Sequence, residues 1–193
     1  MDKATIASAF TRYGTDKGPR RHNYQTAYAS IFGDWTPQSI LEIGVWEGAS
    51  LAAWKDLFPD ATVAGIELRQ YETMAAASNI PVFYGNSTNK EFIDSAVTTQ
   101  YDVIIDDGDH RPDVMWKTFL NLEDKWKKYY VFEDVCLEES EKLLRRRLKS
   151  KGYRNIQTFT SSFNDPKTNL RGWVQVQGEK VYPPFYITIV SRE

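Results

Sequence analysis

The chain has 193 residues, 41% of them hydrophobic, which is enough for one well-buried core but short for two domains. Its formal net charge of −2 argues against a nucleic-acid partner or an anionic membrane surface, and no apolar run approaches the roughly 20 residues that span a bilayer. A single cysteine, Cys136, excludes an internal disulfide, and no long apolar region follows the first residues. We therefore expect a soluble, cytoplasmic protein without a secretory signal.

The N-terminal segment predicts two short helices joined by a turn. Apolar residues recur at helical spacing at Ile6, Phe10 and Tyr13. This pattern predicts an amphipathic helix that ends at Gly14, and a second helix is expected to run to Phe32. Between them, the glycines around residues 15–17 favour an exposed turn. On spacing alone, His22 is more typical of a surface histidine than of a binding site.

An apolar run at residues 39–43 predicts a buried parallel strand that turns sharply into a helix. The connection reads Glu-x-Gly-x-x-x-Gly-x-Ser, and its functional residues are Glu42, Gly44, Val45, Gly48 and Ser50. The glycines let a ligand approach the backbone, and the first N–H groups of the helix can meet polar ligand groups. The third glycine of a dinucleotide fingerprint is missing, and Trp46 would crowd a pyrophosphate. A tight turn without any ligand is the alternative interpretation.

The following units continue an alternation of strands and helices. Strands are predicted at residues 62–68 and 81–84, with a short helix at 71–78 between them. Glu67 ends the first of these strands about 20 residues beyond the glycine loop, where a ribose diol would be held. Asn86 and Ser87 follow the next strand. The alternative for this position is a helix cap by Ser87 or Thr88.

Acidic residues follow two neighbouring buried strands. The strand at residues 101–105 runs into Asp106, Asp107, Asp109 and His110, and the strand at 129–132 runs into Glu133 and Asp134. The carboxyl ends of parallel strands open onto one crevice, so the two groups are expected to converge. Clustered carboxylates repel one another unless a cation compensates, and oxygen ligands suit Mg²⁺. The alternative is an acidic turn that caps the next helix.

The helix after this acidic turn is expected to bury Met115, Phe119, Leu122 and Trp126. A further helix follows Glu138, and its basic run at residues 145–147 is interpreted as a solvated face. The tail predicts strands at residues 153–159, 172–176 and 185–190. The segments 161–169 and 181–184 are candidates for loops that shape an acceptor pocket.

Together, these motifs resemble class I S-adenosylmethionine-dependent methyltransferases, from about residue 13 to residue 135. The glycine loop resembles the first motif of that family. The string YGTDK at residues 13–17, followed by His22-x-Tyr24, resembles bacterial methyltransferases related to the macrolide sugar O-methyltransferases. DGDH at 107–110 with Glu-Asp at 133–134 resembles the metal site of divalent-cation-dependent O-methyltransferases, including the macrolide and aminocoumarin sugar enzymes.

The resemblance implies an α/β, Rossmann-like, doubly wound fold with a mostly parallel seven-stranded sheet and an antiparallel C-terminal edge strand. It implies one domain over residues 1–193, with a helical arm at 1–36 and the core at 37–193. Implied cofactor residues are Lys17, Glu42, Gly44, Val45, Gly48, Ser50, Glu67, Asn86, Ser87 and Asp106. Implied metal ligands are Asp107, Glu133 and Asp134, with His110 or Asp109 as the base. Where the family commonly carries Gly-Asp beside the adenine, this chain has Asn86.

The expected function is therefore S-adenosylmethionine-dependent, metal-assisted O-methylation, with Mg²⁺ as the ion and a small-molecule or sugar-containing acceptor. The chain is short, without the extra N-terminal domain or long insertions of the larger relatives, so acceptor and partner choice stay open, including a homo-oligomer. The alternatives are a non-catalytic cofactor-binding or assembly module, a nicotinamide-dependent oxidoreductase and a nucleic-acid methyltransferase. The missing third glycine of the dinucleotide fingerprint argues against the oxidoreductase. The near-neutral net charge argues against the nucleic-acid methyltransferase.

Overall fold

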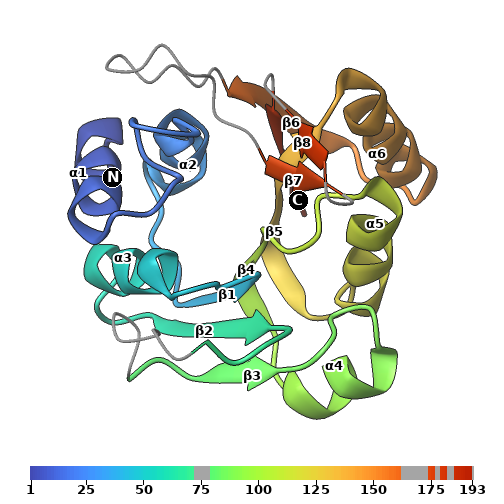
Figure 1. Ribbon diagram of the computed structural model, residues 1–193, viewed down its shortest axis with the longest axis horizontal. Coiled ribbons are helices and arrows are strands. Elements are labelled where there is room, and N and C mark those ends of the chain that lie inside the picture. Colours follow the sequence, from blue (N-terminus) through green and yellow to red (C-terminus); the bar gives the residue numbers. More distant parts are fainter. Residues whose placement is uncertain (72–78, 162–173, 177–178, 182–184, 193) are drawn as a thin grey trace.

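A computed structural model of the chain describes residues 1–71, 79–161, 174–176, 179–181 and 185–192. Its main feature is a seven-stranded sheet with the strand order β3-β2-β1-β4-β5-β9-β6 (Figure 1). The strands of this sheet are β1 (Ser39–Ile43), β2 (Thr62–Glu67), β3 (Val82–Tyr84), β4 (Tyr101–Asp106), β5 (Trp126–Cys136), β6 (Asn155–Ser161) and β9 (Phe185–Ser191). A separate two-stranded sheet joins β7 (Val174–Val176) and β8 (Glu179–Val181).

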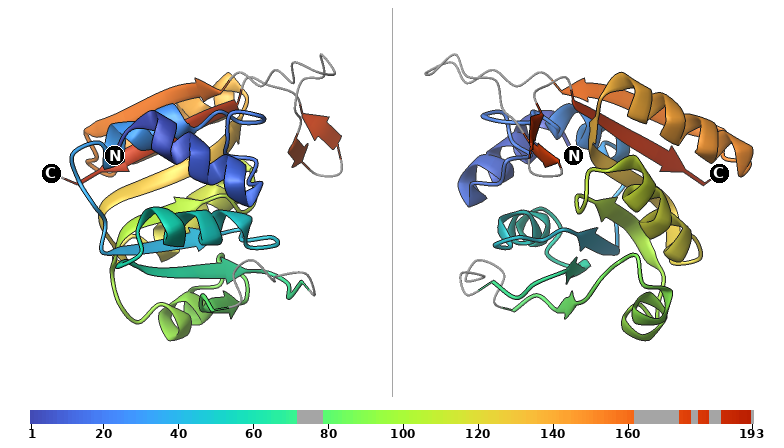
Figure 2. Two further views of the ribbon diagram at one scale, coloured as in Figure 1. Left: turned by 90° about the vertical axis from the view of Figure 1, so that its left-hand side faces the viewer. Right: turned by 45° about the vertical axis from the view of Figure 1, so that its right-hand side comes forward.

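Six helices are described alongside these strands. They are α1 (Lys3–Tyr13), α2 (Gln25–Phe32), α3 (Ala49–Leu57), α4 (Lys90–Ala96), α5 (Pro112–Asn121) and α6 (Glu138–Ser150). Among them, α1–α3 lie on one side of the sheet and α4–α6 on the other (Figure 2). The predicted doubly wound, mostly parallel architecture is confirmed.

The central strands are apolar on both faces because both faces are covered. Successive residues of a strand point to opposite sides, so β1 sends Ile40 into one core cluster and Leu41 into the other. By the same alternation, Glu42 and Glu133 lie on the face covered by α1–α3. This placement decides which side chains can reach these carboxylates.

The N-terminal arm packs directly on the core. Phe10 of α1 and Tyr28 of α2 contact the indole of Trp54 in α3, with ring centroids 5.1 Å and 4.7 Å apart. Trp54 is fully buried, and the predicted end of α1 at Gly14 is confirmed by a left-handed backbone with φ of 73°. The predicted division of the chain at residues 36 and 37 stays a prediction.

The predicted antiparallel C-terminal edge of the sheet is confirmed. β9 lies between β5 and β6 and pairs antiparallel with both, so β6 forms the edge. The expected helix at residues 71–78 and the expected loops at 161–169 and 181–184 lie almost wholly outside the described residues. In the described part of the chain, no helix is long and apolar enough to cross a membrane.

Two element boundaries need correction. β5 was expected to end at Phe132, but it continues to Cys136, because a bulge at Glu133 and Asp134 absorbs the two acids without ending the strand. Trp126 was assigned to the buried stripe of α5, but it is the first residue of β5. A helical stripe and the start of a buried strand have the same apolar character over a few residues.

Candidate active site

The glycine loop after β1 lies against the loop after β4. Gly44 has φ of +84°, and a Cβ atom there would lie 2.1 Å from the carbonyl oxygen of Asp107. The amide of Gly44 donates to the carbonyl of Ile66 at 2.9 Å, and the amide of Asp107 donates to the carbonyl of Ile43 at 2.9 Å. Gly44 therefore allows the close approach that brings the glycine loop beside the first acidic group.

The remaining residues of the glycine loop lead into α3. Gly48 is its N-cap with φ of 83°, and Val45 and Ser50 are buried. Trp46 has φ of 50°, is 67% exposed and stacks on Tyr71 with ring centroids 5.9 Å apart. The cofactor roles expected for Gly44, Val45, Gly48 and Ser50 stay predictions.

Glu67 ends β2 in an orientation fixed by the backbone. One carboxylate oxygen accepts from the amide of Trp46 at 2.9 Å, and the other accepts from the amides of Leu68 at 2.7 Å and Arg69 at 3.3 Å. A carboxylate offers about four lone-pair sites, so these three bonds leave capacity for a hydroxyl of a ligand. This geometry suits the expected ribose role of Glu67.

Asn86 and Ser87 make local contacts. Asn86 accepts from the amide and the hydroxyl of Thr88, each at 2.9 Å. The Ser87 hydroxyl lies 3.0 Å from that of Thr118. The cap of α4 is Asn89, so the alternative of a cap by Ser87 or Thr88 is wrong. The adenine contact expected of Asn86 and Ser87 stays a prediction.

Asp106 is buried at the end of β4. Its carboxylate accepts from the hydroxyl of Tyr130 at 3.2 Å and from the amide of Gly108 at 3.3 Å. Burial disfavours the charged form and raises the pKa of Asp106 to about 7, although both hydrogen bonds act in the opposite direction. Asp106 therefore lies behind the acidic crevice, on the side of Tyr130.

Three predicted residues come together beyond the strand ends. Asp107, His110 and Asp134 each offer one ligand atom, and these atoms lie within 4.8 Å of one another. Asp134 has φ of 50°, an uncommon backbone for a residue other than glycine, and it lies in the β5 bulge. Glu133 and Asp134 both lie at this bulge, and only Asp134 belongs to the group with Asp107 and His110. Nδ1 of His110 is buried and has no hydrogen-bond partner among the described residues.

Asp109 points elsewhere. Arg111 donates to both of its carboxylate oxygens, from Nε at 2.8 Å and from a terminal nitrogen at 2.5 Å. Burial raises the pKa of Asp109, but the hydrogen bonds and charge of Arg111 outweigh it and lower the pKa. The N-cap of α5 is Arg111, so the alternative of an acidic turn that caps this helix is wrong. Of the two expected bases, His110 alone belongs to the group of potential ligands.

Lys17 is the residue at the centre of the carboxylates. The turn at residues 15–17 was expected to be exposed, yet Lys17 is 1% exposed. Its Nζ lies 3.0 Å from Oε1 of Glu42 and 2.5 Å from Oδ2 of Asp107, and it also donates to Oε2 of Glu133. The expectation failed because a local turn pattern cannot report a long side chain that reaches inward between three acids.

Glu42 is fully buried. It was expected to accept from a hydroxyl or an ammonium, and the ammonium beside it is that of Lys17. Its other oxygen accepts from Nε1 of Trp54 at 3.0 Å. Direct contact of Glu42 or Lys17 with a cofactor stays a prediction.

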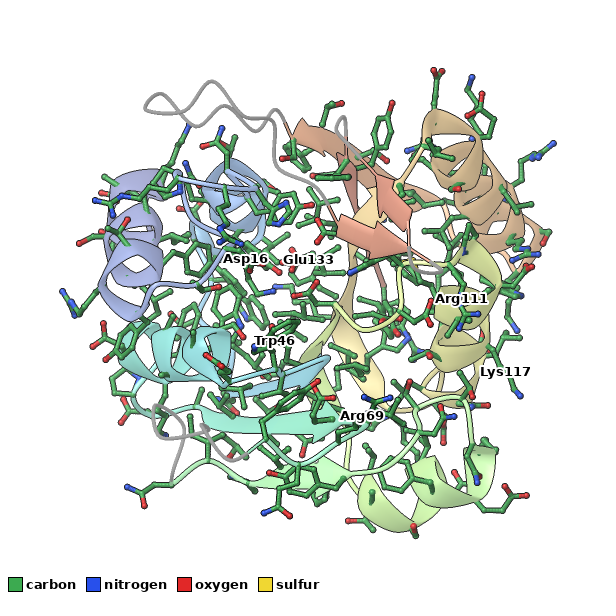
Figure 3. All side chains as sticks on the ribbon, viewed as in Figure 1. Asp16, Trp46, Arg69, Arg111, Lys117 and Glu133 are labelled. Atoms are coloured by element: carbon green, nitrogen blue, oxygen red, sulfur yellow. The ribbon has the colours of Figure 1, made fainter. Side chains whose placement is uncertain are left out.

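The arm adds three further side chains to the acidic centre: Tyr28 from α2, Tyr24 at the N-cap of α2 and His22 from the loop before it. Tyr28 donates to Oε1 of Glu133, and Tyr24 donates to Oδ1 of Asp134. His22 is buried, with Nδ1 3.3 Å from Asp134 and Nε2 3.6 Å from Asp16. Figure 3 labels Asp16 of the arm and Glu133 of β5. Burial lowers the pKa of His22, but Asp134 and Asp16 raise it overall. Tyr24 and Tyr28 were not predicted as site residues; their i, i+4 spacing beside the YGTDK string was the available signal.

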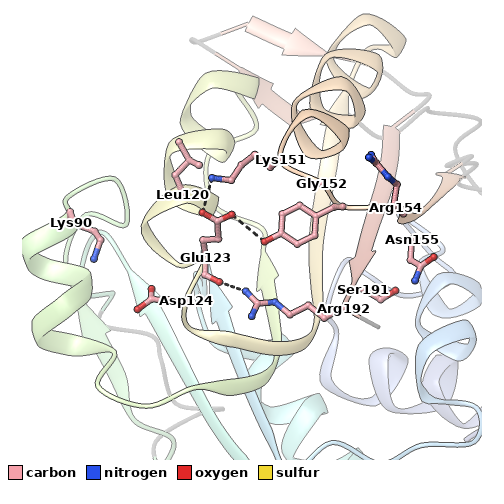
Figure 4. A pocket seen from close by; sticks show the side chains of 11 residues that line it. Lys90, Leu120, Glu123, Asp124, Lys151, Gly152, Arg154, Asn155, Ser191 and Arg192 are labelled. Atoms are coloured by element: carbon pink, nitrogen blue, oxygen red, sulfur yellow. Dashed lines mark hydrogen bonds and ion pairs between the residues drawn. The ribbon is translucent and has the colours of Figure 1, made fainter.

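A hollow lies at the opposite end of the strands from the acidic centre, where β5 and β6 begin and β9 ends (Figure 4). Its volume is about 870 Å³, and its walls carry exposed charged residues and Tyr153. Glu123 pairs with Lys151 at 2.8 Å and accepts from the Tyr153 hydroxyl at 3.2 Å. These groups are already paired in solvent, so this groove is not the candidate active site.

The sheet order, the glycine loop and the acidic edge define the class I S-adenosylmethionine-dependent methyltransferase fold. Solved structures of such enzymes match this chain. The MycE methyltransferase of mycinamycin biosynthesis, in complex with Mg and SAH, has a TM-score of 0.68 at 21% identity and covers 96% of this chain. An O-methyltransferase from Bacillus cereus in complex with SAH has a TM-score of 0.61 at 14% identity, covering 98% of this chain and 91% of its own.

A curated relative is the mycinamicin VI 2″-O-methyltransferase of Micromonospora griseorubida, which is 29% identical over 119 residues. The matched part is 56% of this chain, and it spans 30% of the relative's length. The chain likewise spans 54% of the MycE chain. No family model matches the sequence.

Proposed function

We propose that this chain is an S-adenosylmethionine-dependent O-methyltransferase that uses a divalent ion, Mg²⁺, and methylates a hydroxyl of a small-molecule or sugar-containing acceptor. One observation carries the proposal: the glycine loop, Glu67 and the group Asp107, His110 and Asp134 meet at the same edge of the sheet. The likeness to a 2″-O-methyltransferase supports a hydroxyl acceptor.

The residues at the carboxyl ends of these strands fit both the cofactor and the divalent ion. Glu67 has spare lone pairs for a ribose diol, and the carboxylate oxygens of Asp107 and Asp134 form a donor set that suits Mg²⁺ with several waters. When bound, the cofactor supplies the activated methyl group, and the ion stabilises negative charge on the acceptor oxygen. Asp107 and Asp134 would hold the ion.

The chain itself supplies a proton acceptor. A hydroxyl is a poor nucleophile until it loses its proton, and His110 lies beside both carboxylates with a buried, unpartnered Nδ1. A neutral imidazole can take that proton. Asp109 is a poorer base because Arg111 occupies both of its oxygens.

Calorimetric titration of S-adenosylhomocysteine tests the cofactor half of the proposal. We expect binding to the wild type, and a loss of roughly tenfold or more in Glu67→Ala, because the buried carboxylate is the expected ribose partner. Glu123→Ala, in the groove at the opposite edge, is the matched control and should bind as the wild type does. Absence of wild-type binding both with Mg²⁺ and with EDTA would refute the assignment.

Transfer of labelled methyl groups from S-adenosylmethionine to a panel of glycosides and vicinal diols tests the catalytic half. His110→Ala should reduce the rate by roughly 10²-fold or more while leaving S-adenosylhomocysteine binding intact. Cofactor binding without transfer to any acceptor of the panel would favour the non-catalytic binding module.

A further inference from the structure

The inference concerns the cation that the chain itself places among its acids. Lys17 comes from the loop between α1 and α2, yet its ammonium contacts carboxylates from three separate strands or strand ends. These are Glu42 of β1, Asp107 after β4 and Glu133 of β5. The ammonium donates hydrogen bonds to Asp107 and Glu133 and forms an ion pair with Glu42. We call this arrangement the inner position.

Glu133 has no oxygen left to turn outward. Lys17 occupies Oε2, and the hydroxyl of Tyr28 occupies Oε1. The side chain is 1% exposed and lies on the face of the sheet that the arm covers. A carboxylate held from both sides in this way would have to break two charge-assisted contacts before it could bind a metal ion.

Asp107 is placed differently. Lys17 occupies Oδ2, and in the part of the chain that the structure describes no hydrogen bond reaches Oδ1. The side chain is 17% exposed, in contrast to the fully covered Glu133. Asp107 therefore belongs both to the inner position and to the group with His110 and Asp134, which we call the outer position.

The charge balance explains why the inner position has to be filled. Three carboxylates in a low-dielectric interior repel one another strongly unless a cation lies between them. Lys17 supplies that cation, since its Nζ contacts all three carboxylates.

We propose that Lys17 is the resident cation of this acidic centre, filling the inner position so that a divalent ion binds only at the outer position and Glu133 is not a metal ligand. The proposal rests on the proposed function, since it divides the predicted metal site into two parts. It makes the arm a component of the metal site: Lys17 sets both the number of ions and which carboxylates hold them.

The test is the stoichiometry of Mn²⁺ binding to the 193-residue chain, measured by calorimetry and by electron paramagnetic resonance. The wild type should bind one ion. Lys17→Met empties the inner position and leaves three carboxylates there, so this variant should bind two. A folded Lys17→Met protein that binds one ion with unchanged affinity would overturn the proposal.

A charge-neutral double variant keeps the test decisive if Lys17→Met does not fold. Lys17→Met combined with Glu133→Gln removes one positive and one negative charge, so it should still bind Mn²⁺ within about tenfold of the wild-type affinity. Asp134→Asn, which removes an outer ligand, should lose more than that. If the double variant loses binding as Asp134→Asn does, Glu133 is a ligand and the proposal is wrong.

Lysine labelling with an N-hydroxysuccinimide ester, read by mass spectrometry, gives a measurement independent of catalysis. Lys17 should stay unlabelled with and without Mn²⁺, whereas Lys142, 60% exposed, should label in both states. Labelling of Lys17 only after Mn²⁺ is added would mean that the metal displaces it, and would overturn the proposal. S-adenosylhomocysteine binding is scored separately, so a failed methyltransferase assignment and a failed Lys17 assignment give different results.

Discussion

Charged side chains at the two ends of the parallel strands differ in solvent exposure: those at the carboxyl ends are buried, and those at the amino ends are exposed. At the carboxyl ends of the parallel strands, Glu42, Glu133 and Lys17 are at most 1% exposed. The two carboxylates share the ammonium of Lys17. At the other edge, Glu123 and Lys151 pair at 2.8 Å with about a third of each side chain in solvent. Distances of similar length therefore describe different energetics, because solvent screens the second pair and leaves the first unscreened.

The difference teaches where function can be sought. A buried group of acids destabilises the fold unless a cation compensates its charge. The presence of such a group therefore indicates a functional site, and here we assign it to the proposed cofactor and metal chemistry. The groove at the other end of the strands has a volume of about 870 Å³, but Glu123 and Lys151 in its wall are paired with each other at the surface.

Lys17→Met should break this contrast with the largest effect. Removing one partner of a buried ionic cluster costs about 3–5 kcal/mol, since three carboxylates lose their shared cation. Urea unfolding measures the loss. Lys142→Met, in an exposed i, i+4 pair, is the control and should leave the urea midpoint essentially unchanged. A loss below about 1 kcal/mol in Lys17→Met would contradict the buried assignment.

Gly44→Ala is expected to come next, at roughly 2–4 kcal/mol. A left-handed backbone penalises any side chain, and the new Cβ would also overlap the carbonyl of Asp107. Gly14→Ala separates the two causes, because Gly14 has φ of +73° with nothing within 4 Å, so it should lose only about 1–2 kcal/mol. Thermal unfolding compares the two. Equal losses would show that the loops after β1 and β4 are not in close contact.

Asp106→Asn should have a pH-dependent effect. The pKa of Asp106 is raised to about 7 in the folded protein from about 4 in the unfolded chain. The folded state therefore keeps a proton that the unfolded chain releases, and the wild type loses stability as pH rises from about 4 to 7. Asparagine removes this dependence, so the variant should match the wild type near pH 4 and exceed it by about 1–3 kcal/mol at pH 8.

Urea unfolding at several pH values measures that difference. Asp124→Asn is the control, because Asp124 is 69% exposed, and it should give no such trend. A constant difference between Asp106→Asn and the wild type across this range would show that Asp106 titrates normally.

Lys151→Met should have the smallest effect on stability. It tests the exposed ion pair against the buried one of Lys17. Its partner Glu123 stays hydrated and keeps the hydroxyl of Tyr153, so the loss should be at most about 0.5–1 kcal/mol and should shrink further in 1 M salt. Denaturant midpoints at low and high salt provide the measurement. A loss as large as that of Lys17→Met would mean that the two edges do not differ as described.

Sequence patterns predicted the elements whose character is local. β1 and β4 have continuous apolar runs and were placed within one residue, and α3 ends before Pro59 as expected. The β5 bulge was missed because two acids read as the end of a buried strand. The position of β9 inside the sheet depends on pairing between distant segments, and no local pattern encodes it.

The candidate site was predictable as a set of residues and less so as an arrangement. The strand-end rule predicted that the acids and the histidine after β4 and β5 converge, and of these Asp107, His110 and Asp134 come together. Sequence did not separate Glu133 from Asp134, since only the bulge and the covering arm give them different surroundings. Lys17 drew attention through the YGTDK string, but its burial among acids follows from how the arm docks on α3.

The position of β9 between β5 and β6 also determines the order in which the sheet can fold during synthesis. β6 pairs with β9 in the main sheet, and β9 is about 24 residues further along the chain. On a ribosome, β5 therefore has an open edge and β6 has no neighbour until β9 emerges, and such unpaired strands are prone to associate with other chains. Ribosome-stalled chains that stop before Phe185 should thus be protease-sensitive and recruit chaperones, and those that expose β9 should become resistant.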